Sequence, residues 1–409
     1  MKTTFLKIAF LSLLFSAVVS CSSDNEDPRE VIVDPPTQDD PLTTSNAPTY
    51  MVDVSATKET VALFYNLKKL AKTKTAIGQQ DAFNSFYQDA GGDSDIKKNT
   101  GYDPAVLGSD FMFITDKNNN EQIGNWFYGE EIKIKSAVKN AYAKGIINTF
   151  CWHLREPYKE ESFYAADMTS EQKNTAFKSI LPGGANNEWY KKKLDKIANV
   201  VSDLKGSNGE LIPIIFRPFH EFDGSWFWWG ANFCTVDEYK KAYQFTVDYL
   251  KNTKSVHNIL YAFSPDNSYT TQADYLSRYP GDKYVDIIGM DNYGDFNNQG
   301  QTGADRANSK LKILSDYAKT KVKIAALTET GFRVTSTNPA IIDWFSTLLY
   351  SSLTKNDIQI SYVMFWNNDK DGYYVPTGSV SNATDFKNYS AKTKSALVNS
   401  LPKMYEMPK

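Results

Sequence analysis

Short apolar runs alternate along the chain with longer stretches whose apolar residues recur at helical spacing. Eight short runs can be counted, at residues 75–79, 105–109, 146–153, 212–219, 259–263, 285–290, 323–328 and 361–366. The longer stretches carry charges between their apolar positions and include residues 189–204, 236–252, 308–320 and 339–353. Short apolar runs favour buried strands, and apolar residues at every third or fourth position favour amphipathic helices.

Strands that alternate with helices predict a parallel sheet. Eight such strands in one domain favour an α/β fold of the closed (β/α)8 barrel (TIM barrel) type. A doubly wound sheet is the competing architecture, but no glycine-rich phosphate loop supports it. We therefore predict a single barrel domain over residues 49–409, with residues 156–187 as a surface insertion over its mouth.

Composition narrows the possible functions. The 409-residue chain has a net charge of −3 and no visible basic stripe, which argues against nucleic-acid binding. Its 24 Phe, 25 Tyr and 8 Trp suit a large core or a site that stacks sugars. Three histidines argue against a histidine-rich metal centre, and three cysteines exclude a dense disulfide framework. Whether Cys151 and Cys234 pair is left open.

Residues 1–20 have the pattern of a signal peptide. Two lysines precede an apolar run over residues 8–19, which is too short to cross a membrane as a helix. Small residues stand directly before Cys21, and this arrangement resembles the lipobox of bacterial lipoproteins. In that class Cys21 becomes the lipid-bearing N-terminus. An ordinary secretory signal with an incidental cysteine is the alternative.

Residues 21–48 are expected to comprise the lipidated cysteine and an acidic linker. The linker is rich in Ser, Asp, Glu, Pro and Thr and offers almost nothing to bury, so we expect a disordered tether. Acidic residues just after the lipid-bearing cysteine resemble the surface-export signal of Bacteroidota lipoproteins. We therefore expect an outer-membrane lipoprotein that faces outward and touches the membrane only through its lipid anchor. A protein that faces the periplasm is the alternative.

Polar and aromatic residues collect where the predicted strands end. In a barrel, these ends and the loops after them form the mouth, where catalytic groups lie. The candidate site residues at these ends are His153, Arg217, His220, Glu221, Trp226, Tyr293, Glu329 and Trp366.

Glu221 and Glu329 are the pair that we expect to catalyse a reaction. Each closes an apolar run, at the fourth and the seventh strand, so each carboxyl should project into the mouth. Glycoside hydrolysis needs two carboxyl groups: one protonates the leaving oxygen, and the other attacks the anomeric carbon or activates water. A separation of about 5–5.5 Å gives retention and about 6.5–9.5 Å gives inversion, and the sequence does not supply this distance. For one isolated glutamate, a surface ion pair would be the simpler explanation.

Three neighbours of this pair have both a packing and a functional interpretation. Arg217 could form a barrel ion pair, or it could keep a nucleophile ionised, because a nearby cation lowers the pKa of a carboxyl. His220 could pack, or it could orient or tune Glu221. Tyr293 could pack, or its hydroxyl could hydrogen-bond the nucleophile.

The aromatic residues raise the same question. Trp226, Trp228 and Trp229 directly follow a candidate acid, so we expect at least one of them to stack on a sugar rather than in the core. Trp366 at the last strand end and His153 at the third strand end are expected to line the same site.

These blocks resemble glycoside hydrolase family 26, whose best-known members are β-mannanases. The matching blocks are residues 102–108, 145–153, 217–221 with 226–230, 289–293 and 328–331. Five blocks in the same order, over about residues 50–405, agree by chance far less readily than one block does.

The resemblance implies a clan-A barrel and a retaining double displacement, with no metal and no cofactor. Glu221 would then be the acid/base and Glu329 the nucleophile. Tyr293 would assist Glu329, and Arg217 would support it.

The resemblance also implies a substrate site. His153 and Trp366 would line the −1 sugar subsite, and Trp226 would lie toward the aglycone. His220 stands where related clan members often carry Asn. One position departs from the family pattern: many members have Asn-Pro after the histidine block, and this chain has Glu156 before the proline. The detail of the substrate is therefore open.

We predict a surface-tethered, retaining endo-β-1,4-mannanase that acts on mannan, glucomannan or galactomannan and is a monomer. One alternative keeps the fold and mechanism but acts on another β-glycan, such as β-1,3-xylan or mixed-linkage glucan, or releases mannobiose as an exo-enzyme. An alternative of another class is a non-catalytic glycan-binding lipoprotein. That class predicts the loss of one carboxylate, and both are present.

Overall fold

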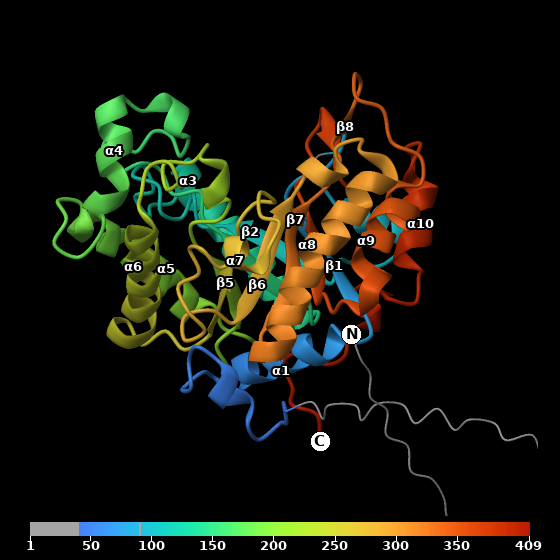
Figure 1. Ribbon diagram of the computed structural model, residues 1–409, viewed down its shortest axis with the longest axis horizontal. Coiled ribbons are helices and arrows are strands. Elements are labelled where there is room, and N and C mark those ends of the chain that lie inside the picture. The colour runs from blue at the N-terminus through green and yellow to red at the C-terminus, as the bar shows by residue number, and fades with distance from the viewer. Residues whose placement is uncertain (1–40, 90) are drawn as a thin grey trace, which may run out of the picture. The chain divides into compact units, whose positions relative to one another are not determined.

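Eight parallel strands form a closed barrel in the computed structural model, which describes residues 41–89 and 91–409 (Figure 1). The barrel strands are β1 (Thr75–Gln80), β2 (Val106–Asp110), β3 (Ile147–Cys151), β4 (Ile214–Arg217), β5 (Ile259–Phe263), β6 (Ile287–Asn292), β7 (Ile324–Thr330) and β9 (Tyr362–Phe365). Each strand pairs with the next, and β1 pairs with β9, which closes the sheet. The predicted (β/α)8 barrel is confirmed, and the eight apolar runs correspond to its eight strands.

Helices surround these strands (Figure 1). The longer helices are α1 (Lys58–Leu70), α3 (Trp126–Ala143), α5 (Asn187–Asp203), α6 (Val236–Asp248) and α8 (Gly300–Lys321). The shorter helices are α2 (Asp95–Thr100), α4 (Ser170–Ser179), α7 (Gln272–Tyr275), α9 (Tyr350–Thr354) and α10 (Ala383–Ser390). The helix expected over residues 339–353 begins only at Trp344, because Asp343 before it has a left-handed backbone with φ of 53°.

Shorter elements complete the described part. A two-stranded antiparallel sheet joins β8 (Val334–Thr335) to β10 (Gly372–Tyr373), and β11 (Ser395–Ala396) pairs with β1. Single turns of 3-10 helix lie at Ala47–Tyr50, Ala165–Asp167, Phe222–Gly224, Gly294–Phe296, Lys355–Asp357 and Val398–Ser400. Turns of π-helix lie at Tyr249–Thr253 and Trp344–Leu349.

Alternation along the strands divides the core into two layers. In β4, Ile215 packs with apolar residues of the other strands in the barrel interior. Its neighbours Ile214 and Phe216 pack outward in the layer beneath the helices. Because side chains alternate with a period of two, Arg217 shares the inward face of Ile215 and lies where the strand runs into the mouth.

The N-terminal segment closes the other end of the barrel, which we call the bottom. Leu63 and Phe64 of α1 belong to the interior apolar cluster. Asp286 accepts hydrogen bonds from the backbone N–H groups of Val52, at 2.8 Å, and Tyr261, at 2.9 Å. The carboxylate therefore ties the N-terminal segment to two strands.

Residues 41–48, which the sequence assigns to the tether, belong to this folded part. Leu42 and Ala47 are buried in the interior cluster because both are apolar and lie against the barrel bottom. The predicted signal peptide, Cys21 and the linker up to residue 40 lie outside the described residues. No helix in the described ranges has the length and apolar character that crossing a membrane requires.

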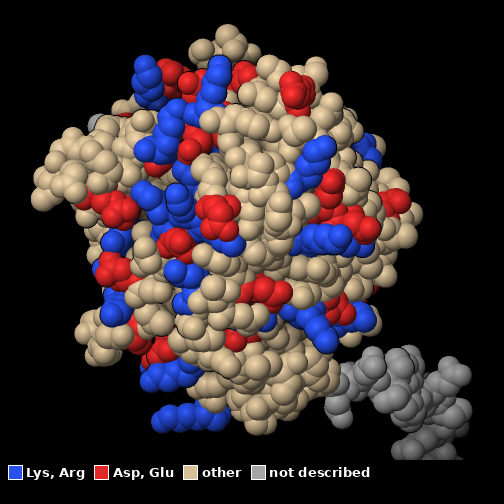
Figure 2. Space-filling model, turned by 90° about the vertical axis from the view of Figure 1, so that its left-hand side faces the viewer, with Lys and Arg blue, Asp and Glu red and all other residues tan. Residues whose placement is uncertain are grey.

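Charged side chains are mixed on the face shown in Figure 2. Lysine and arginine stand among aspartate and glutamate, and no stripe of one sign crosses this face. Such a surface lacks the electrostatic footprint of a nucleic-acid binder on this side. Cys151 and Cys234, whose pairing the sequence left open, are both buried and free.

Candidate active site

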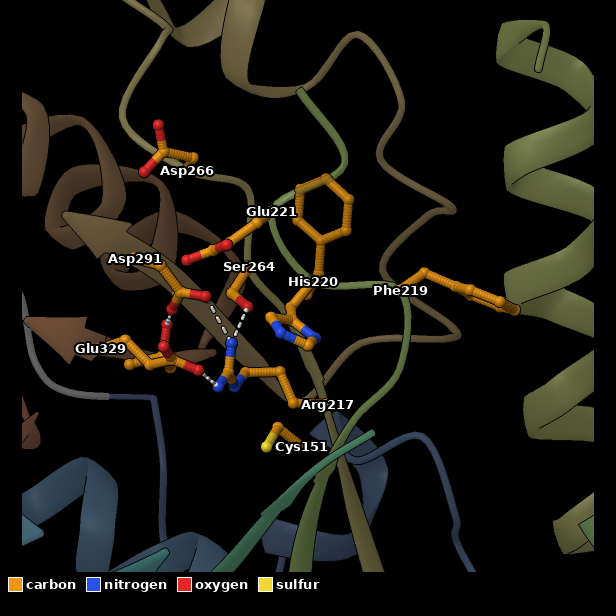
Figure 3. Close-up of polar contacts among 12 residues, drawn as sticks. Cys151, Arg217, Phe219, His220, Glu221, Ser264, Asp266, Asp291 and Glu329 are labelled. Atoms are coloured by element: carbon orange, nitrogen blue, oxygen red, sulfur yellow. Dashed lines mark hydrogen bonds and ion pairs between the residues drawn. The ribbon is translucent and has the colours of Figure 1, made fainter. Parts of the chain in front are cut away.

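A cleft of about 500 Å³ opens at the carboxyl ends of the strands. Six of the predicted site residues line it: His153, Glu221, Trp226, Tyr293, Glu329 and Trp366. The other two predicted residues, Arg217 and His220, are buried beside it and contact members of this set (Figure 3). The structure thus brings all eight predicted strand-end residues to one place.

A β-bulge aims Glu329 into the cleft. Met290 of β6 pairs with Leu327 of β7, but the next residue, Asp291, pairs with Glu329, so that Thr328 is an extra residue. Strict alternation would place Glu329 on the outward face with Leu327, which packs in the outer layer. With the bulge, the Thr328 hydroxyl donates to Asp291 at 2.7 Å, and Glu329 reaches the cleft.

Arg217 and Tyr293 surround the Glu329 carboxyl with donors. Arg217 Nη2 donates to Oε1 of Glu329, and the Tyr293 hydroxyl donates to Oε2 at 3.1 Å. Nη1 of the same guanidinium donates to Asp291 and, at 3.0 Å, to Ser264. Figure 3 shows the guanidinium of Arg217 with dashed lines to Asp291, Ser264 and Glu329. The Glu329 carboxyl thus accepts from one buried cation and one hydroxyl.

A tight turn after β4 positions Glu221. Phe219 has φ of 54° and Glu221 has φ of 52°, a left-handed backbone that is uncommon for residues other than glycine. The Glu221 N–H donates to the Ser264 carbonyl at 2.9 Å, and Trp229 Nε1 donates to the His220 carbonyl at 2.7 Å. These bonds compensate the strain of the turn. The turn points Glu221 into the mouth although β4 itself ends at Arg217.

Burial sets the protonation of Glu221. The residue is 8% exposed, and burial raises the pKa of its carboxyl well above the ordinary value, with the charges of Glu329, Asp291 and Asp266 adding to the rise. Trp226 Nε1 donates to Oε2 at 2.8 Å, which lowers the same pKa in part. Burial and the neighbouring acidic groups therefore favour the protonated form of Glu221. Oxygens of Glu221, Asp291 and Glu329 lie within 4.8 Å of one another.

His153 and His220 face each other beside this carboxyl group. Their Nε2 atoms are 3.3 Å apart, and the rings meet edge to face with centroids at 4.6 Å. Nδ1 of His153 is 2.6 Å from Oδ2 of Asp110. Burial, followed by the charge of Arg217, lowers the pKa of His220 well below its ordinary value. His220 is therefore neutral at ordinary pH.

The structure separates the three tryptophans that follow Glu221. Trp226 lines the cleft and is 38% exposed. Trp228 and Trp229 are fully buried, and their ring N–H groups donate to the carbonyls of Leu154 and His220, each at 2.7 Å. The Trp226 ring is thus accessible from the cleft, whereas Trp228 and Trp229 fix the loop after β4 through their hydrogen bonds.

The insertion after β3 forms one wall of the cleft, as its predicted position over the mouth requires. Tyr164 pairs with Phe227 across an antiparallel bridge, and the Ala165 N–H donates to the Trp226 carbonyl at 2.7 Å. The Glu156 carboxylate accepts backbone N–H groups within its own loop. Glu156, the position at which the chain departs from the family pattern, therefore holds together the loop that forms this wall.

Residues 52–343 match the family model of glycosyl hydrolase family 26. The chain belongs to this family. A solved family 26 structure, described as GH26C from Muricauda sp., is 56% identical, has a TM-score of 0.89 and aligns with 90% of this chain and 99% of that one.

Other relatives of this family 26 chain carry names that state an activity. The solved β-mannanase BoMan26A of Bacteroides ovatus is 30% identical, with a TM-score of 0.75, over 86% of this chain and 98% of that one. A mannan endo-1,4-β-mannosidase of Bifidobacterium adolescentis is 33% identical over 85% of this chain and 35% of its own length. The chain spans about a third to a half of the length of the first curated relatives that it matches.

Six residues that line the cleft of this family 26 chain are not among the predicted site residues: Tyr164, Phe227, Asp266, Asn267, Gly294 and Tyr374. Asp266 lies just after β5, and burial, followed by the charge of Asp223, raises its pKa to about 7. Its place after an apolar run is a signal that could have found it. Tyr374 follows β10, and Tyr164 lies in the insertion, so no strand-end signal marks either.

Two groups of side chains in the described ranges are of types that bind metals: Asp110, Cys151 and His153, and also Glu221, Asp291 and Glu329. In the first group Asp110 already engages His153, and burial raises the pKa of the Cys151 thiol well above its ordinary value. In the second group Arg217 supplies the positive charge. Protein contacts thus occupy both groups, and a cofactor-free reaction stays a prediction.

A larger hollow, of about 950 Å³, opens at the bottom of the barrel. Lys144, Glu210 and Tyr405 are among its walls, and they come from segments before the strands or from the C-terminal tail. Residues at this end of a barrel usually serve stability, and active sites lie at the opposite end. The smaller cleft at the mouth is therefore the candidate active site.

Proposed function

We propose that this family 26 protein is a retaining endo-β-1,4-mannanase that hydrolyses mannan, glucomannan or galactomannan. One observation carries the proposal: Glu221 and Glu329 share a cleft with oxygens within 4.8 Å, where Glu329 pairs with Arg217 and burial raises the pKa of Glu221. A glycosidase of this kind needs one protonated and one charged carboxyl group. The names of several relatives, mannan endo-1,4-β-mannosidase, support the substrate and the endo mode of action.

The first step would join the sugar to Glu329. Its carboxylate, which accepts from Arg217, attacks the anomeric carbon and forms a covalent ester. The glycosidic C–O bond breaks, and the protonated Glu221 gives its proton to the departing oxygen. The aglycone leaves as an alcohol, and Glu221 is left as a carboxylate that accepts the Trp226 N–H.

The second step would release the sugar. The Glu221 carboxylate takes a proton from water, and the resulting hydroxide attacks the anomeric carbon while its bond to Glu329 breaks. Two inversions give net retention. An oxygen of each carboxyl group lies within 4.8 Å of the other, and this closeness supports retention over inversion, in which the carboxyl groups stand about 6.5–9.5 Å apart to admit a water molecule.

Product release from a set of glycans tests the function. The mature protein would be compared with Glu329→Ala and Glu221→Ala on linear mannan, galactomannan, β-1,3-xylan and mixed-linkage glucan. We expect internal cleavage of a mannan by the wild type and its loss in both variants. Activity on another glycan alone would overturn the substrate. Glycan binding with no cleavage would instead support a non-catalytic binding protein.

Azide rescue tests the two roles separately. With an aryl mannoside that has a good leaving group, Glu329→Ala plus azide should give the α-glycosyl azide, because azide then replaces the nucleophile in a single inversion. Glu221→Ala plus azide should give the β-glycosyl azide, because azide attacks the glycosyl–enzyme in the second inversion. The reverse pairing of products would exchange the two assignments.

We also propose that Cys21 carries a lipid and anchors the protein on the outward face of the outer membrane. The support is the sequence pattern alone, because Cys21 lies outside the described residues. Labelled palmitate should enter the wild type and not Cys21→Ala, and protease added to intact cells should degrade the wild type. Labelling with full protection from protease would favour the periplasmic face, and absence of labelling would contradict the anchor.

A further inference from the structure

Two of the three histidines of the chain form a hydrogen-bonded series with Asp110, which we call the histidine relay. Oδ2 of Asp110 lies 2.6 Å from Nδ1 of His153, and Nε2 of His153 lies 3.3 Å from Nε2 of His220. Oδ1 of Asp110 accepts the backbone N–H groups of Met112, at 2.8 Å, and His153, at 3.1 Å. His220 directly precedes Glu221, so the relay ends beside the proposed acid/base.

Hydrogen-bond chemistry determines the tautomers along the relay. An ionised carboxylate can only accept, and Asp110 accepts from two backbone N–H groups. Nδ1 of His153 must therefore donate, which leaves a lone pair on Nε2 in a neutral ring. The contact between the two Nε2 atoms then needs a donor from His220. His220 accordingly carries its proton on Nε2 and a lone pair on Nδ1.

The opposite arrangement would be costly in this environment. In that arrangement Nε2 of His153 would carry a proton and donate to Nε2 of His220. His220 would then carry its proton on Nδ1. That atom is buried and has no hydrogen-bond partner among the described residues. Buried N–H groups without an acceptor are rare, so this tautomer is disfavoured.

We propose that Asp110 is a positioning residue of the active site, which acts through the tautomers of His153 and His220. Both ring nitrogens of His153 are engaged within the protein, so the ring presents its edge rather than a hydrogen bond to the cleft, beside Trp366 with centroids 5.9 Å apart. The relay also keeps His220 neutral next to Glu221. A cationic His220 would favour the charged form of Glu221, which cannot protonate a leaving group. This role rests on the proposed glycosidase function.

Asp110→Asn should reverse the relay. The two backbone N–H groups need an acceptor, so the amide oxygen must take the place of Oδ1, and the amide NH₂ must face His153. Nδ1 of His153 then has to accept, and its proton moves to Nε2. His220 must in turn accept on Nε2 and carry its proton on Nδ1. Both rings change tautomer while the side-chain volumes stay almost the same.

The third histidine provides a matched control at the barrel bottom. His257 Nδ1 lies 2.7 Å from Oδ2 of Asp53, and Oδ1 of Asp53 accepts the Ser55 N–H at 2.9 Å. Asp53→Asn should therefore reverse the tautomer of His257 by the same chemistry. This pair lies far from the mouth, so the variant should leave catalysis unchanged.

Long-range ¹⁵N–¹H correlation spectra of the ¹⁵N-histidine-labelled mature protein read all three rings at once. The wild type should show neutral rings, with His153 protonated on Nδ1 and His220 on Nε2. Asp110→Asn should exchange both signatures and lower kcat/KM on mannan by about 10- to 100-fold, the range seen when the carboxylate or carbonyl partner of a metal-bound histidine is removed. Asp53→Asn should change only His257 and leave kcat/KM as in the wild type.

Distinct outcomes would overturn the relay. These are a wild-type His220 protonated on Nδ1, a doubly protonated His153, or reversed tautomers in Asp110→Asn with unchanged kcat/KM. An equal loss of kcat/KM in Asp53→Asn would assign the effect to stability. The wild-type spectrum tests the relay even when Asp110→Asn folds poorly. A wild type with the expected tautomers and no activity on any glycan would overturn the proposed function and support the relay's geometry.

Discussion

The two ends of the barrel both bury charged side chains, and they differ in what those side chains bind. At the bottom, Asp286 accepts the backbone N–H groups of Val52 and Tyr261, and Lys323 donates to the Tyr50 carbonyl at 2.8 Å. Each charge thus ties one stretch of backbone to another. Losing such a bond would leave a buried backbone group without a partner, so this end serves the stability of the fold.

At the mouth, the charges bind one another. Arg217 donates to the side chains of Ser264, Asp291 and Glu329. Glu221 stands nearby, and in the described part of the chain no Lys or Arg forms an ion pair with it. These contacts join side chains to one another and do not hold the backbone. The comparison teaches that the barrel keeps stability and chemistry at opposite ends, as barrels generally do. Substitutions at the mouth should therefore lower activity, and substitutions of similar size at the bottom should lower the stability of the fold.

Glu329→Gln should produce the largest effect and should confine it to activity. The amide keeps the shape of the carboxyl: its oxygen can accept from Arg217, and its NH₂ can donate to the Tyr293 hydroxyl. It cannot attack the anomeric carbon. We expect kcat on mannan to fall by about 10⁴-fold or more, the scale seen when a nucleophile is removed. Thermal unfolding should stay close to the wild type. A comparable loss of stability would show that this end also holds the fold.

Asp286→Asn should show the converse pattern. An amide has one accepting oxygen, so either the Val52 or the Tyr261 N–H loses its partner, at a cost of about 1–3 kcal/mol in the free energy of unfolding. Denaturant titration measures this loss, and kcat/KM should be unchanged where the protein is folded. Asp316→Asn, at an exposed ion pair with Lys312, is the matched control and should be nearly neutral. A fall in kcat/KM for folded Asp286→Asn would show that the bottom of the barrel also contributes to catalysis.

Most of the fold could be predicted from the sequence because its signals are local. Eight apolar runs became eight strands, since a parallel strand buried on both faces must be apolar along its length. The late start of the helix at Trp344 depends on the backbone of Asp343, which no apolar period reports. Burial of Leu42 and Ala47 likewise depends on the barrel bottom, so the composition of this stretch alone suggested a tether.

The sequence predicted most of the residues that form the site, but not the geometry in which they are held. Strand ends converge in any barrel, so residues at those ends could be grouped without a structure. Glu329 points into the cleft because of a β-bulge, and nothing in the sequence marks the register shift between β6 and β7 that creates the bulge. Trp226 and Trp228 look alike in sequence, and only packing separates the cleft residue from the buried one. Tyr374 reaches the cleft through tertiary structure alone.

Asp266→Asn should shift the pH dependence of catalysis at the mouth. The charge of Asp266 helps to raise the pKa of Glu221, so its removal lowers that pKa. Glu221 then loses its proton at lower pH, and the alkaline limb of kcat/KM should move down by a few tenths of a unit to about one unit. Asp316→Asn should leave the profile in place. An unmoved limb in Asp266→Asn would remove Asp266 from the electrostatics of Glu221.

The same variant should change stability with a defined sign. Burial raises the pKa of Asp266 from 3.8 to about 7, so the folded state binds this proton more tightly than the unfolded chain. The resulting stabilisation is present below the unfolded pKa and is lost as the pH rises toward 7. Asp266→Asn should therefore gain stability over the wild type near pH 8 relative to pH 4. Thermal melts at the two pH values measure this difference, and an equal difference at both would contradict the raised pKa.

Trp226→Phe should have the smallest effect, with a sign opposite to that of Asp266→Asn. The indole N–H donates to Glu221 and lowers its pKa in part, so its loss should raise that pKa and move the alkaline limb of kcat/KM up by a few tenths of a unit. A phenyl ring keeps an aromatic surface for the sugar, so kcat/KM at the optimum should fall less than about tenfold. Trp126→Phe, at an exposed tryptophan of α3, should leave the limb unmoved. We expect opposite shifts in the two cleft variants because Asp266 raises and Trp226 lowers the pKa of the same group, Glu221. Shifts in the same direction would show that another group controls the alkaline limb.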